Sequence, residues 1–555
     1  MSKALAWIAL AWIALTIADS LSTASAIATS TSDRQPTIIG VTQGKLAGRV
    51  DAHGIRSFKG IPYAQPPVGP QRWKAPVAAG PWPGVRDATT FGASCLAPPW
   101  PADSIYADHP PHFSEDCLSL NVWAASAAQH AAVIVFIYGG ALIRGSSWEP
   151  TYDGTHFAEH GVVFVSINYR LGPLGWLALP ELSAESPHQV SGNYGLLDQI
   201  EALKWVQKNI AAFGGDPGNV TIMGESAGGS SVAYLMASPL ARGLFHKAIG
   251  QSLNIQSVPE LKQANHGLPS AEQIGVGFEK AVGAADLAAL RSMDGNTLTL
   301  AAANGGSRSG GTMDGWVLPG QVVDTFDRKE EALVPVLMGF NQGEIQTLLR
   351  YLPSLPASDE IYTAEINTRY GDLAPQFLRL YPSDDVKGSM MAALRDALCA
   401  WSAERIVRNI AAAGVPAYLY LFDHDYPAAR ARQLHAFHAS ELPYIFGDVG
   451  KGAPLPENWP VPEGAREKSL SDAMLAYWTS FARSGVPTAQ SWPDWPRFTQ
   501  HAAYMHFARA PQASIDLMPG MFELHEEVME RERRAGNLPW SGNVGVAAPT
   551  LPGSR

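Results

Sequence analysis

Two short runs of apolar residues stand out in the first third of the chain. Residues 132–138 read AVIVFIY and residues 162–168 read VVFVSIN, and both runs are rich in β-branched side chains. Continuous apolar runs of this length are typical of strands that are buried on both faces of a parallel sheet. We therefore expect central strands at Ala132–Tyr138 and Val162–Asn168.

A helical pattern follows over Tyr194–Phe213, where apolar residues recur at helical spacing until a pair of glycines ends the pattern. A further strand, Asn219–Met223, leads into a second helix at Ala227–Met236, which ends before a Ser-Pro pair. This alternation of strand and helix predicts an α/β fold with a doubly wound, mostly parallel sheet flanked by helices.

Later segments continue the alternation toward the C-terminus. Val334–Phe340 and Ala417–Phe422 again have the pattern of buried strands. Residues 251–335 are rich in glycine, alanine and polar residues and have weaker periodicity, so we interpret them as helical insertions over the sheet. The tail 539–555 has little apolar pattern, and we expect it to be disordered.

Composition places the chain among globular proteins with a large core. It has 555 residues, of which 46% are hydrophobic and 16% are charged. Neither a flexible linker nor an internal repeat divides its middle, so we expect one large domain over 27–538. The net charge of −11 argues against nucleic acid as a partner, because phosphate binding requires a basic surface.

The first residues have the pattern of an export signal. Lys3 provides a positive start, Ala4–Ala18 forms an apolar stretch, and Ala24–Ala26 fits a cleavage site. The apolar stretch is shorter than a membrane-spanning helix requires, so we expect a signal peptide over 1–26 that is removed, with cleavage after Ala28 as the alternative. The mature protein would then lack a membrane anchor and be secreted or periplasmic.

Three cysteines provide a further indication of the compartment. In an exported protein we expect a disulfide between the two that are close in sequence, Cys95 and Cys117, with Cys399 left free. The alternative is a set of three reduced, buried thiols.

The candidate nucleophile is Ser226, in the segment Gly224–Gly228 that reads GESAG. A pattern of G-x-S-x-G is weak evidence by itself, but here it follows the strand Asn219–Met223 and opens a helix. That context is what a nucleophile elbow requires, because the turn exposes the serine while small neighbours let strand and helix approach each other.

Acyl transfer also needs backbone donors for the oxyanion that forms in the transition state. Gly139, Gly140 and Ala141 follow the expected strand that ends at Tyr138, and small residues there leave N–H groups free to face a substrate. We expect Gly140, Ala141 and the N–H of Ala227 to form the oxyanion hole.

The acid and the base of a catalytic triad are harder to select among 51 acidic residues and 15 histidines. In a fold of this class they follow the nucleophile along the chain, in loops after later strands. Glu344 follows the strand Val334–Phe340, and both His435 and His438 follow the strand Ala417–Phe422. The residues themselves leave the choice between the two histidines open.

Short motifs occur in a fixed order from the region of Gly60 to Phe498. The longer ones are Phe58–Ala64, Ser114–Asn121, Asn168–Gly172, Gly192–Gln199, Phe213–Pro217 and Gly224–Gly229. Together they resemble the type B carboxylesterase family, the α/β-hydrolases that include the cholinesterases. The resemblance implies the α/β-hydrolase fold and a serine esterase of the secreted bacterial type.

The resemblance also implies roles for single residues. Gly339–Glu344 is similar to the segment that carries the acidic member of the triad, which implies Glu344. The family's histidine stands three positions before a glutamate and a leucine, so His438 fits this pattern and His435 does not. The cysteine of the Ser114–Asn121 segment is normally disulfide-bonded, in agreement with a pairing of Cys95 and Cys117.

Some positions depart from the family pattern, namely Leu142, Gly343, Ile345 and Leu253. Because such positions lie near the pocket in this family, we expect them to affect substrate preference. We name Leu142 and Arg144 as candidate substrate-binding residues, and Arg144 could attract substrates that carry a carboxylate. The alternative is an arginine paired with structural acids.

The predicted function is hydrolysis of small-molecule carboxylic esters through an acyl-enzyme, without a metal or an organic cofactor. The segment Asp423–Asp425 could suggest a metal site, but we interpret it as polar residues at the end of a strand. Two alternatives remain. One is a non-catalytic binding module of the same fold, and the other is an amide or lactone hydrolase that uses the same triad.

Overall fold

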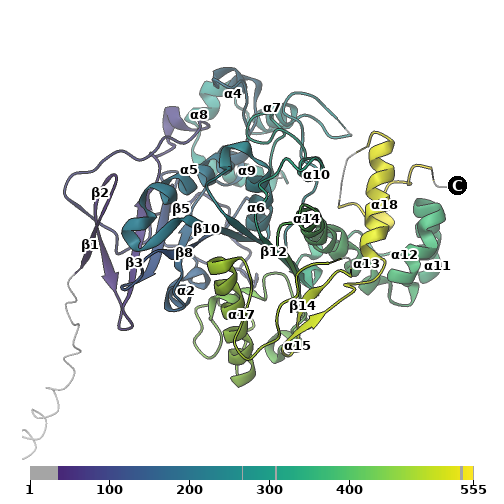
Figure 1. The fold of residues 1–555 in the computed structure, drawn as a ribbon. Coiled ribbons are helices and arrows are strands. Elements are labelled where there is room, and N and C mark those ends of the chain that lie inside the picture. The colour runs from purple at the N-terminus through teal and green to yellow at the C-terminus, as the bar shows by residue number, and fades with distance from the viewer. Residues whose placement is uncertain (1–35, 266, 307–308, 500, 538–541, 554–555) are drawn as a thin grey trace, which may run out of the picture. The chain divides into compact units, whose positions relative to one another are not determined.

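The computed structural model describes residues 36–555 apart from 266, 307–308, 500, 538–541 and 554–555, and the predicted signal peptide 1–26 lies outside the described residues. Contacts group Thr37–Arg555 into one unit. Its centre is a sheet to which 13 strands of the described residues belong (Figure 1). The predicted α/β fold class is confirmed.

The strands of the sheet follow one another in space in an order that departs from their order along the chain. In spatial order they are β1 (Thr37–Val41), β2 (Gly44–Val50), β3 (Ile55–Pro62), β7 (Ser119–Ala125), β9 (Val163–Ile167), β8 (Ala131–Ile137), β10 (Gly215–Glu225), β11 (Lys247–Gln251), β12 (Val336–Asn341), β13 (Ala417–Phe422), β14 (Tyr504–Phe507) and β15 (Pro511–Ser514). The short strand β4 (Val85–Asp87) pairs with β2, and β5 (Ser94–Cys95) and β6 (Phe113–Ser114) form a separate ladder.

The middle of the sheet is parallel, and its two ends are antiparallel except for the parallel pair of β2 and β4. All pairs from β9 through β8, β10, β11, β12 and β13 to β14 run parallel. The five strands that the sequence predicts are all present within this part, with boundaries shifted by a few residues at most for β8, β9, β12 and β13. The carboxyl ends of these strands therefore meet at one edge of the sheet, where a doubly wound fold places its ligands.

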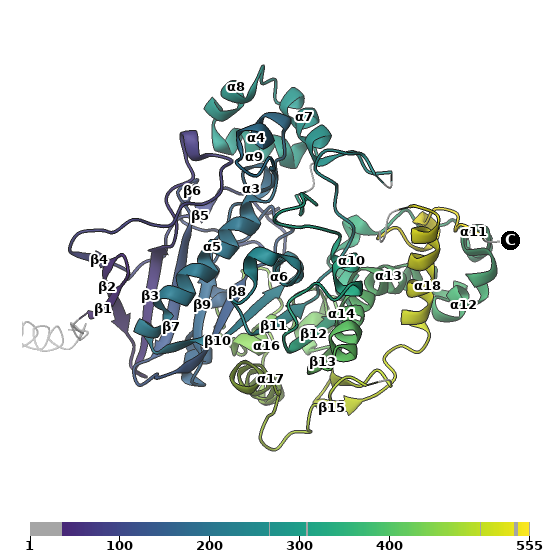
Figure 2. The same cartoon turned by 45° about the horizontal axis from the view of Figure 1, so that its top comes forward.

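The helices are listed here in chain order: α2 (Thr155–Glu159), α3 (Gly172–Trp176), α4 (Pro180–Glu185), α5 (Tyr194–Asn209), α6 (Ala227–Ala237), α7 (Ala271–Ala281), α8 (Leu287–Ser292), α9 (Gly295–Asn304), α10 (Val322–Asp327), α11 (Asp359–Tyr370), α12 (Ala374–Leu380), α13 (Val386–Arg395), α14 (Trp401–Ala412), α15 (Pro427–Ala431), α16 (Leu442–Phe446), α17 (Ala465–Ser484) and α18 (Met521–Arg534). The helices α5, α6, α10 and α14 cover one face of the sheet, and α2, α16 and α17 cover the other (Figures 1 and 2).

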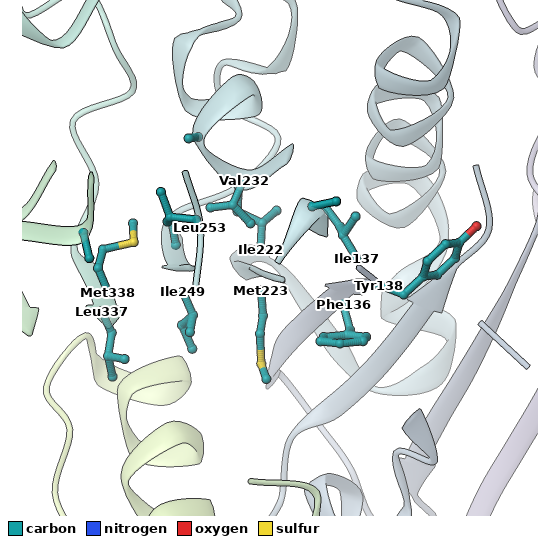
Figure 3. Packing of buried hydrophobic residues seen from close by; sticks show 14 of the residues in the cluster. Phe136, Ile137, Tyr138, Ile222, Met223, Val232, Ile249, Leu253, Leu337 and Met338 are labelled. Atoms are coloured by element: carbon teal, nitrogen blue, oxygen red, sulfur yellow. The ribbon is translucent and has the colours of Figure 1, made fainter. Parts of the chain in front are cut away.

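Side chains of the central strands fill the core on both faces of the sheet because successive residues of a strand point to opposite sides. One row contains Phe136, Met223, Ile249 and Leu337, which are direct neighbours across four strands. Figure 3 shows this row on one side of the sheet and Ile222, together with Val232 of α6, on the other. Burial on both faces explains why these strands are continuous apolar runs in the sequence.

The segment between β11 and β12 contains the predicted helical insertion. It forms α7, α8, α9 and α10. Apolar residues of the first three helices, such as Phe278, Leu290 and Leu298, pack with Leu179 and Leu182 in a small core separate from that of the sheet.

Part of the C-terminal tail differs from the expectation of disorder. Residues 542–553 are described, and Val544 and Leu551 are 7% and 4% exposed. The N–H of Gly545 donates to Tyr370 Oη at 2.8 Å, and that of Leu551 donates to the Arg369 carbonyl at 2.7 Å. The expectation is therefore wrong for these residues, because a few widely spaced apolar side chains and backbone hydrogen bonds fasten them to α11.

The expected disulfide between Cys95 and Cys117 is present, and Cys399 is free and buried. The two joined residues are 22 positions apart in the sequence and enclose a loop without a helix. A cross-link of this kind lowers the entropy of the unfolded chain.

A variant with both Cys95→Ser and Cys117→Ser is expected to lose about 3 kcal/mol of unfolding free energy. Opening a loop of this length raises the entropy of the unfolded chain and so lowers its free energy by that amount. Urea unfolding of the variant and of the oxidised wild type measures the difference. Wild type that has been reduced before unfolding is the control and should match the variant. Equal midpoints for all samples would contradict the expected stabilisation.

Candidate active site

Ser226 occupies a sharp turn between β10 and α6. Its backbone has φ of 56° and ψ of −121°, a left-handed region that a serine enters only under constraint. The turn requires small neighbours. A side chain on Gly224 would lie 2.3 Å from the Gly228 carbonyl oxygen, and one on Gly228 would lie 1.9 Å from the Ile137 carbonyl oxygen.

The loop after β8 lies directly against this turn. A Cβ atom on Gly139 would be 3.0 Å from the Cβ atom of Ser226, so the absence of a side chain lets the two segments approach each other. Gly140 and Ala141 both have positive φ angles. Among the described residues, neither of their N–H groups nor that of Ala227 donates to a protein acceptor. The three predicted oxyanion donors are therefore free to bind a ligand beside Ser226.

His438 contacts Ser226 on one side and Glu344 on the other. Its Nε2 atom lies 2.8 Å from Ser226 Oγ, and its Nδ1 atom is hydrogen-bonded to Glu344 Oε2. Glu344 is completely buried, and His438 has 7% of its surface exposed. The structure thus brings together the three residues that the sequence selects for a triad.

Backbone contacts fix the acidic member and its neighbours. The other oxygen of Glu344 accepts a hydrogen bond from the Asn341 N–H at 2.8 Å. The Asn341 side chain donates to the Phe437 carbonyl at 2.8 Å, and the Gly343 N–H donates to the Ala436 carbonyl at 2.8 Å. The loop after β12 is therefore tied to the loop that carries the histidine.

His435 lies away from Ser226. Its Nε2 atom is 3.5 Å from Asp423, which also accepts from His506 at 3.0 Å, and its Nδ1 atom accepts from the Ala436 N–H at 2.6 Å. Of the two candidate histidines, the structure therefore places His438 at the nucleophile.

Two buried glutamates beside the triad were not assigned a role from the sequence. Glu225 Oε1 lies 3.2 Å from His438 Nε2. Glu441 accepts hydrogen bonds from Gln251 at 2.9 Å and from Asn341 at 2.5 Å. Glu225 directly precedes Ser226, and Glu441 stands three positions after His438. Only the fold shows that Glu225 contacts the imidazole and that Glu441 joins the ends of β11 and β12.

Burial and neighbouring charges have opposite effects on the pKa values of Glu225 and His438. Burial raises the pKa of Glu225 to about 8, although the charge of His438 opposes this. Burial and then the charge of Glu344 raise the pKa of Glu441 to about 7. Burial would lower the pKa of His438, but the charges of Glu225 and Glu344 prevail and raise it to about 9. The carboxylates thus stabilise the imidazolium that forms when the histidine accepts a proton.

Tyr106, from the loop closed by the disulfide, supports the histidine from outside. Its hydroxyl group donates to the His438 carbonyl at 2.8 Å and accepts from Thr347 Oγ1 at 2.7 Å. Its ring packs between Trp100 and Trp459, each with a centroid 5.8 Å away. Nothing in the sequence pattern distinguished this tyrosine from the other 16.

The two predicted substrate-binding residues differ in their surroundings. Leu142 is 4% exposed and packs in the core, so its contact with a substrate stays a prediction. Arg144 is partly buried and contacts the Pro98 carbonyl and the Trp100 ring. The alternative of an arginine paired with structural acids does not hold for the residues that the structure describes.

The central parallel sheet, the strand-turn-helix around Ser226 and the loops after β12 and β13 define an α/β-hydrolase. Residues 35–522 match the model of the carboxylesterase family. The chain belongs to this family.

Relatives and solved structures agree with that assignment. The chain is 36% identical to the fumonisin B1 esterase of Sphingopyxis macrogoltabida over 87% of this chain and 88% of the relative. It is 34% identical to the para-nitrobenzyl esterase of Bacillus subtilis, over 83% and 92%. Its fold is similar to that of a solved PNB esterase, with a TM-score of 0.76, 32% identity and coverage of 88% and 99%. A solved carboxylesterase of Geobacillus stearothermophilus gives a TM-score of 0.75, with the same identity and coverage.

The protein is accordingly a carboxylic ester hydrolase. Within the described part of the chain, no helix has the length and apolar character needed to cross a membrane.

Replacing Glu225 with Gln is expected to move the acid limb of the pH profile of kcat/KM to lower pH. His438 must be neutral to accept a proton, so activity falls as the pH falls through its pKa. Of the neighbouring charges, that of Glu225 raises this pKa most. Profiles from about pH 5 to about pH 10 measure the shift. Glu463→Gln, an exposed change on another loop, is the control. An unmoved limb in the Glu225 variant would exclude this electrostatic role.

Replacing Tyr106 with Phe is expected to lower kcat about fivefold and to leave KM nearly unchanged, because one hydrogen bond of about 1 kcal/mol that holds the His438 loop is lost. Steady-state kinetics on one ester measures the split between kcat and KM. Tyr362→Phe is a matched control, since its hydroxyl group donates to the Tyr381 carbonyl at 3.0 Å away from the site. Equal kcat values for both variants would show that Tyr106 has no positioning role.

Proposed function

We propose that the protein hydrolyses carboxylic esters through an acyl-enzyme on Ser226, with His438 as general base and Glu344 as the supporting acid. The observation that carries the proposal is the 2.8 Å contact between Ser226 Oγ and His438 Nε2, with Glu344 hydrogen-bonded to the other ring nitrogen. This arrangement of nucleophile, base and orienting acid recurs in enzymes of unrelated fold that perform acyl transfer.

In the first half of the reaction, Ser226 Oγ attacks the ester carbonyl carbon while His438 Nε2 accepts the hydroxyl proton. The Nδ1–H group of His438 donates to Glu344, which keeps the ring in the tautomer that leaves Nε2 free to accept. The protonated histidine then donates its proton to the leaving alkoxide. An acyl-enzyme and a free alcohol result.

The backbone donors stabilise the tetrahedral intermediates. The N–H groups of Gly140, Ala141 and Ala227 are without protein acceptors among the described residues, and they lie beside Ser226. In enzymes of this kind each such donor stabilises the transition state by about 3 kcal/mol.

In the second half of the reaction, His438 removes a proton from water, which attacks the acyl-enzyme and releases the acid. The proton returns to Ser226 Oγ. Each step uses groups of this chain, and we propose no metal or organic cofactor. The names of the two relatives refer to different esters, so they do not identify the alcohol and acyl parts of the natural substrate.

We further infer that the protein is exported, to the periplasm or to the medium. The inference rests on the signal pattern over 1–26 and on the disulfide between Cys95 and Cys117. Structural disulfides persist in oxidising compartments and are rare in the cytosol.

Purified protein is expected to hydrolyse p-nitrophenyl acetate, butyrate or octanoate, and Ser226→Ala is expected to lower kcat at least about a thousandfold. Spectrophotometric rates measure both. Ser238→Ala is a matched control, because its buried hydroxyl group at the other end of α6 has no hydrogen-bond partner among the residues that the structure describes.

Full activity of the Ser226 variant would overturn the proposed mechanism. If the wild type hydrolyses none of the esters, a non-catalytic binding module becomes the better interpretation. Matched p-nitroanilides, measured beside the esters, test the alternative of an amide hydrolase.

A further inference from the structure

Arg144 belongs to the same turn as the proposed oxyanion donors. Its backbone N–H donates to the Gly140 carbonyl at 3.0 Å, and the N–H of Ile143 donates to the same oxygen at 3.1 Å. A side chain on Gly140 would lie 2.4 Å from the Arg144 carbonyl oxygen, so the turn is tightly closed. The backbone of Arg144 is therefore held close to the N–H groups that would bind the scissile carbonyl.

Neutral groups support the Arg144 guanidinium. Its Nε atom donates to the Pro98 carbonyl at 3.2 Å, its Nη2 atom donates to the Pro99 carbonyl at 3.4 Å, and the Trp100 ring centroid lies 5.2 Å away. No carboxylate of the described residues forms a salt bridge with it. By contrast, the buried Arg170 pairs with Asp198 at 2.7 Å. The charge of Arg144 is thus positioned but not neutralised.

Arg350 is a second cation without a carboxylate partner among the described residues. It is exposed in the short turn Leu349–Tyr351, and its guanidinium contacts the neighbouring tyrosine, with Tyr351 Oη at 3.1 Å and the ring centroid at 4.6 Å. Arg350 follows Thr347 by three residues, and Thr347 is hydrogen-bonded to Tyr106 at 2.7 Å. The charge of Arg350 also contributes to the lowering of the pKa of Arg144, after burial.

Aromatic side chains connect these cations to the candidate active site. Trp100, under Arg144, packs on Tyr106, whose hydroxyl group is bonded to the His438 carbonyl and to Thr347. Thr347 stands three residues before Arg350. Both arginines therefore lie beside the loops that carry the base and its supporting acid.

We propose that Arg144 and Arg350 bind a carboxylate of the substrate, so that the enzyme prefers esters that carry a negative charge away from the scissile bond. This inference rests on the proposed ester hydrolysis and names its substrate class. A guanidinium group presents paired donors that match a carboxylate, and Trp100 and the two proline carbonyls hold that of Arg144 in place before binding.

The chain has a formal net charge of −11, and the two arginines provide a local attraction for an anionic ester against this background.

Two matched pairs of esters test the proposal. The first pair is p-nitrophenyl octanoate and mono-p-nitrophenyl suberate, which has a terminal carboxylate on an acyl chain of the same length. The second pair is phenyl butyrate and 4-carboxyphenyl butyrate, which places the carboxylate on the alcohol side. The measured quantity is the ratio of kcat/KM for the anionic ester to kcat/KM for the neutral ester.

Arg144→Gln is expected to lower this ratio about tenfold for at least one pair, and Arg350→Gln about threefold because its side chain is exposed. In the wild type the ratio should fall as salt is added, and in the variant with both changes it should not. Arg86→Gln is a matched control. Arg86 lies on the edge strand β4, is exposed, and its guanidinium is 5.6 Å from the Trp82 ring centroid, so its loss should leave the ratio unchanged.

Ratios that neither the two variants nor salt alter, for both pairs, would overturn the proposal. In that case hydrolysis of the neutral esters, and its loss in Ser226→Ala, would still support the proposed function. Absence of hydrolysis for all four esters would instead reject the proposed function, and the preference for anionic esters with it.

Discussion

The site depends on the close approach of three backbone segments around Ser226. The strand β10 ends at Glu225, the helix α6 begins at Ala227, and the carbonyl group of Ile137 at the end of β8 lies where a side chain on Gly228 would be. Because Gly224 and Gly228 have no side chains, the segments can meet. Ser226 is held with a positive φ angle, at hydrogen-bonding distance from His438. A larger residue would have to move the strand or the helix, and either movement would separate Ser226 from its oxyanion donors.

The site also depends on the parallel alignment of the central strands. The neighbouring strands β8, β10, β11, β12 and β13 all end at the same edge, so the loops that follow them converge although they come from distant parts of the sequence. Asn341, at the end of β12, then joins the loop of Glu344 to that of His438 by backbone and side-chain hydrogen bonds. The distance of 2.8 Å between His438 and Ser226 follows from this network rather than from a contact of the two residues alone.

Burial gives the site its electrostatic character. Glu225, Glu344 and Glu441 are nearly inaccessible to water, and an isolated charge there would be costly. The histidine offsets this cost when it is protonated, which couples the protonation of the cluster to each half of the proposed reaction. Outside the cluster, the loop closed by the disulfide contacts His438 through Tyr106 and Arg144 through Trp100, so one loop contacts both residues.

The sequence by itself determined the central strands, which are continuous apolar runs because they are buried on both faces, and the helix α5, whose apolar residues recur at helical spacing. It also indicated α6, which ends before a Ser-Pro pair, and the helical insertion. It also selected Ser226, Glu344, His438 and the disulfide, but the choice of His438 over His435 came from a family resemblance and not from the residues. The tertiary structure decided what no local pattern encodes. The carboxyl group of Glu225 reaches His438, and that of Glu441 reaches Gln251 and Asn341, only after the parallel strands align. Tyr106 donates to the His438 carbonyl across more than 300 positions of the chain. The packing of residues 542–553 was missed for the same reason, since it depends on contacts with α11 and not on any periodicity of its own.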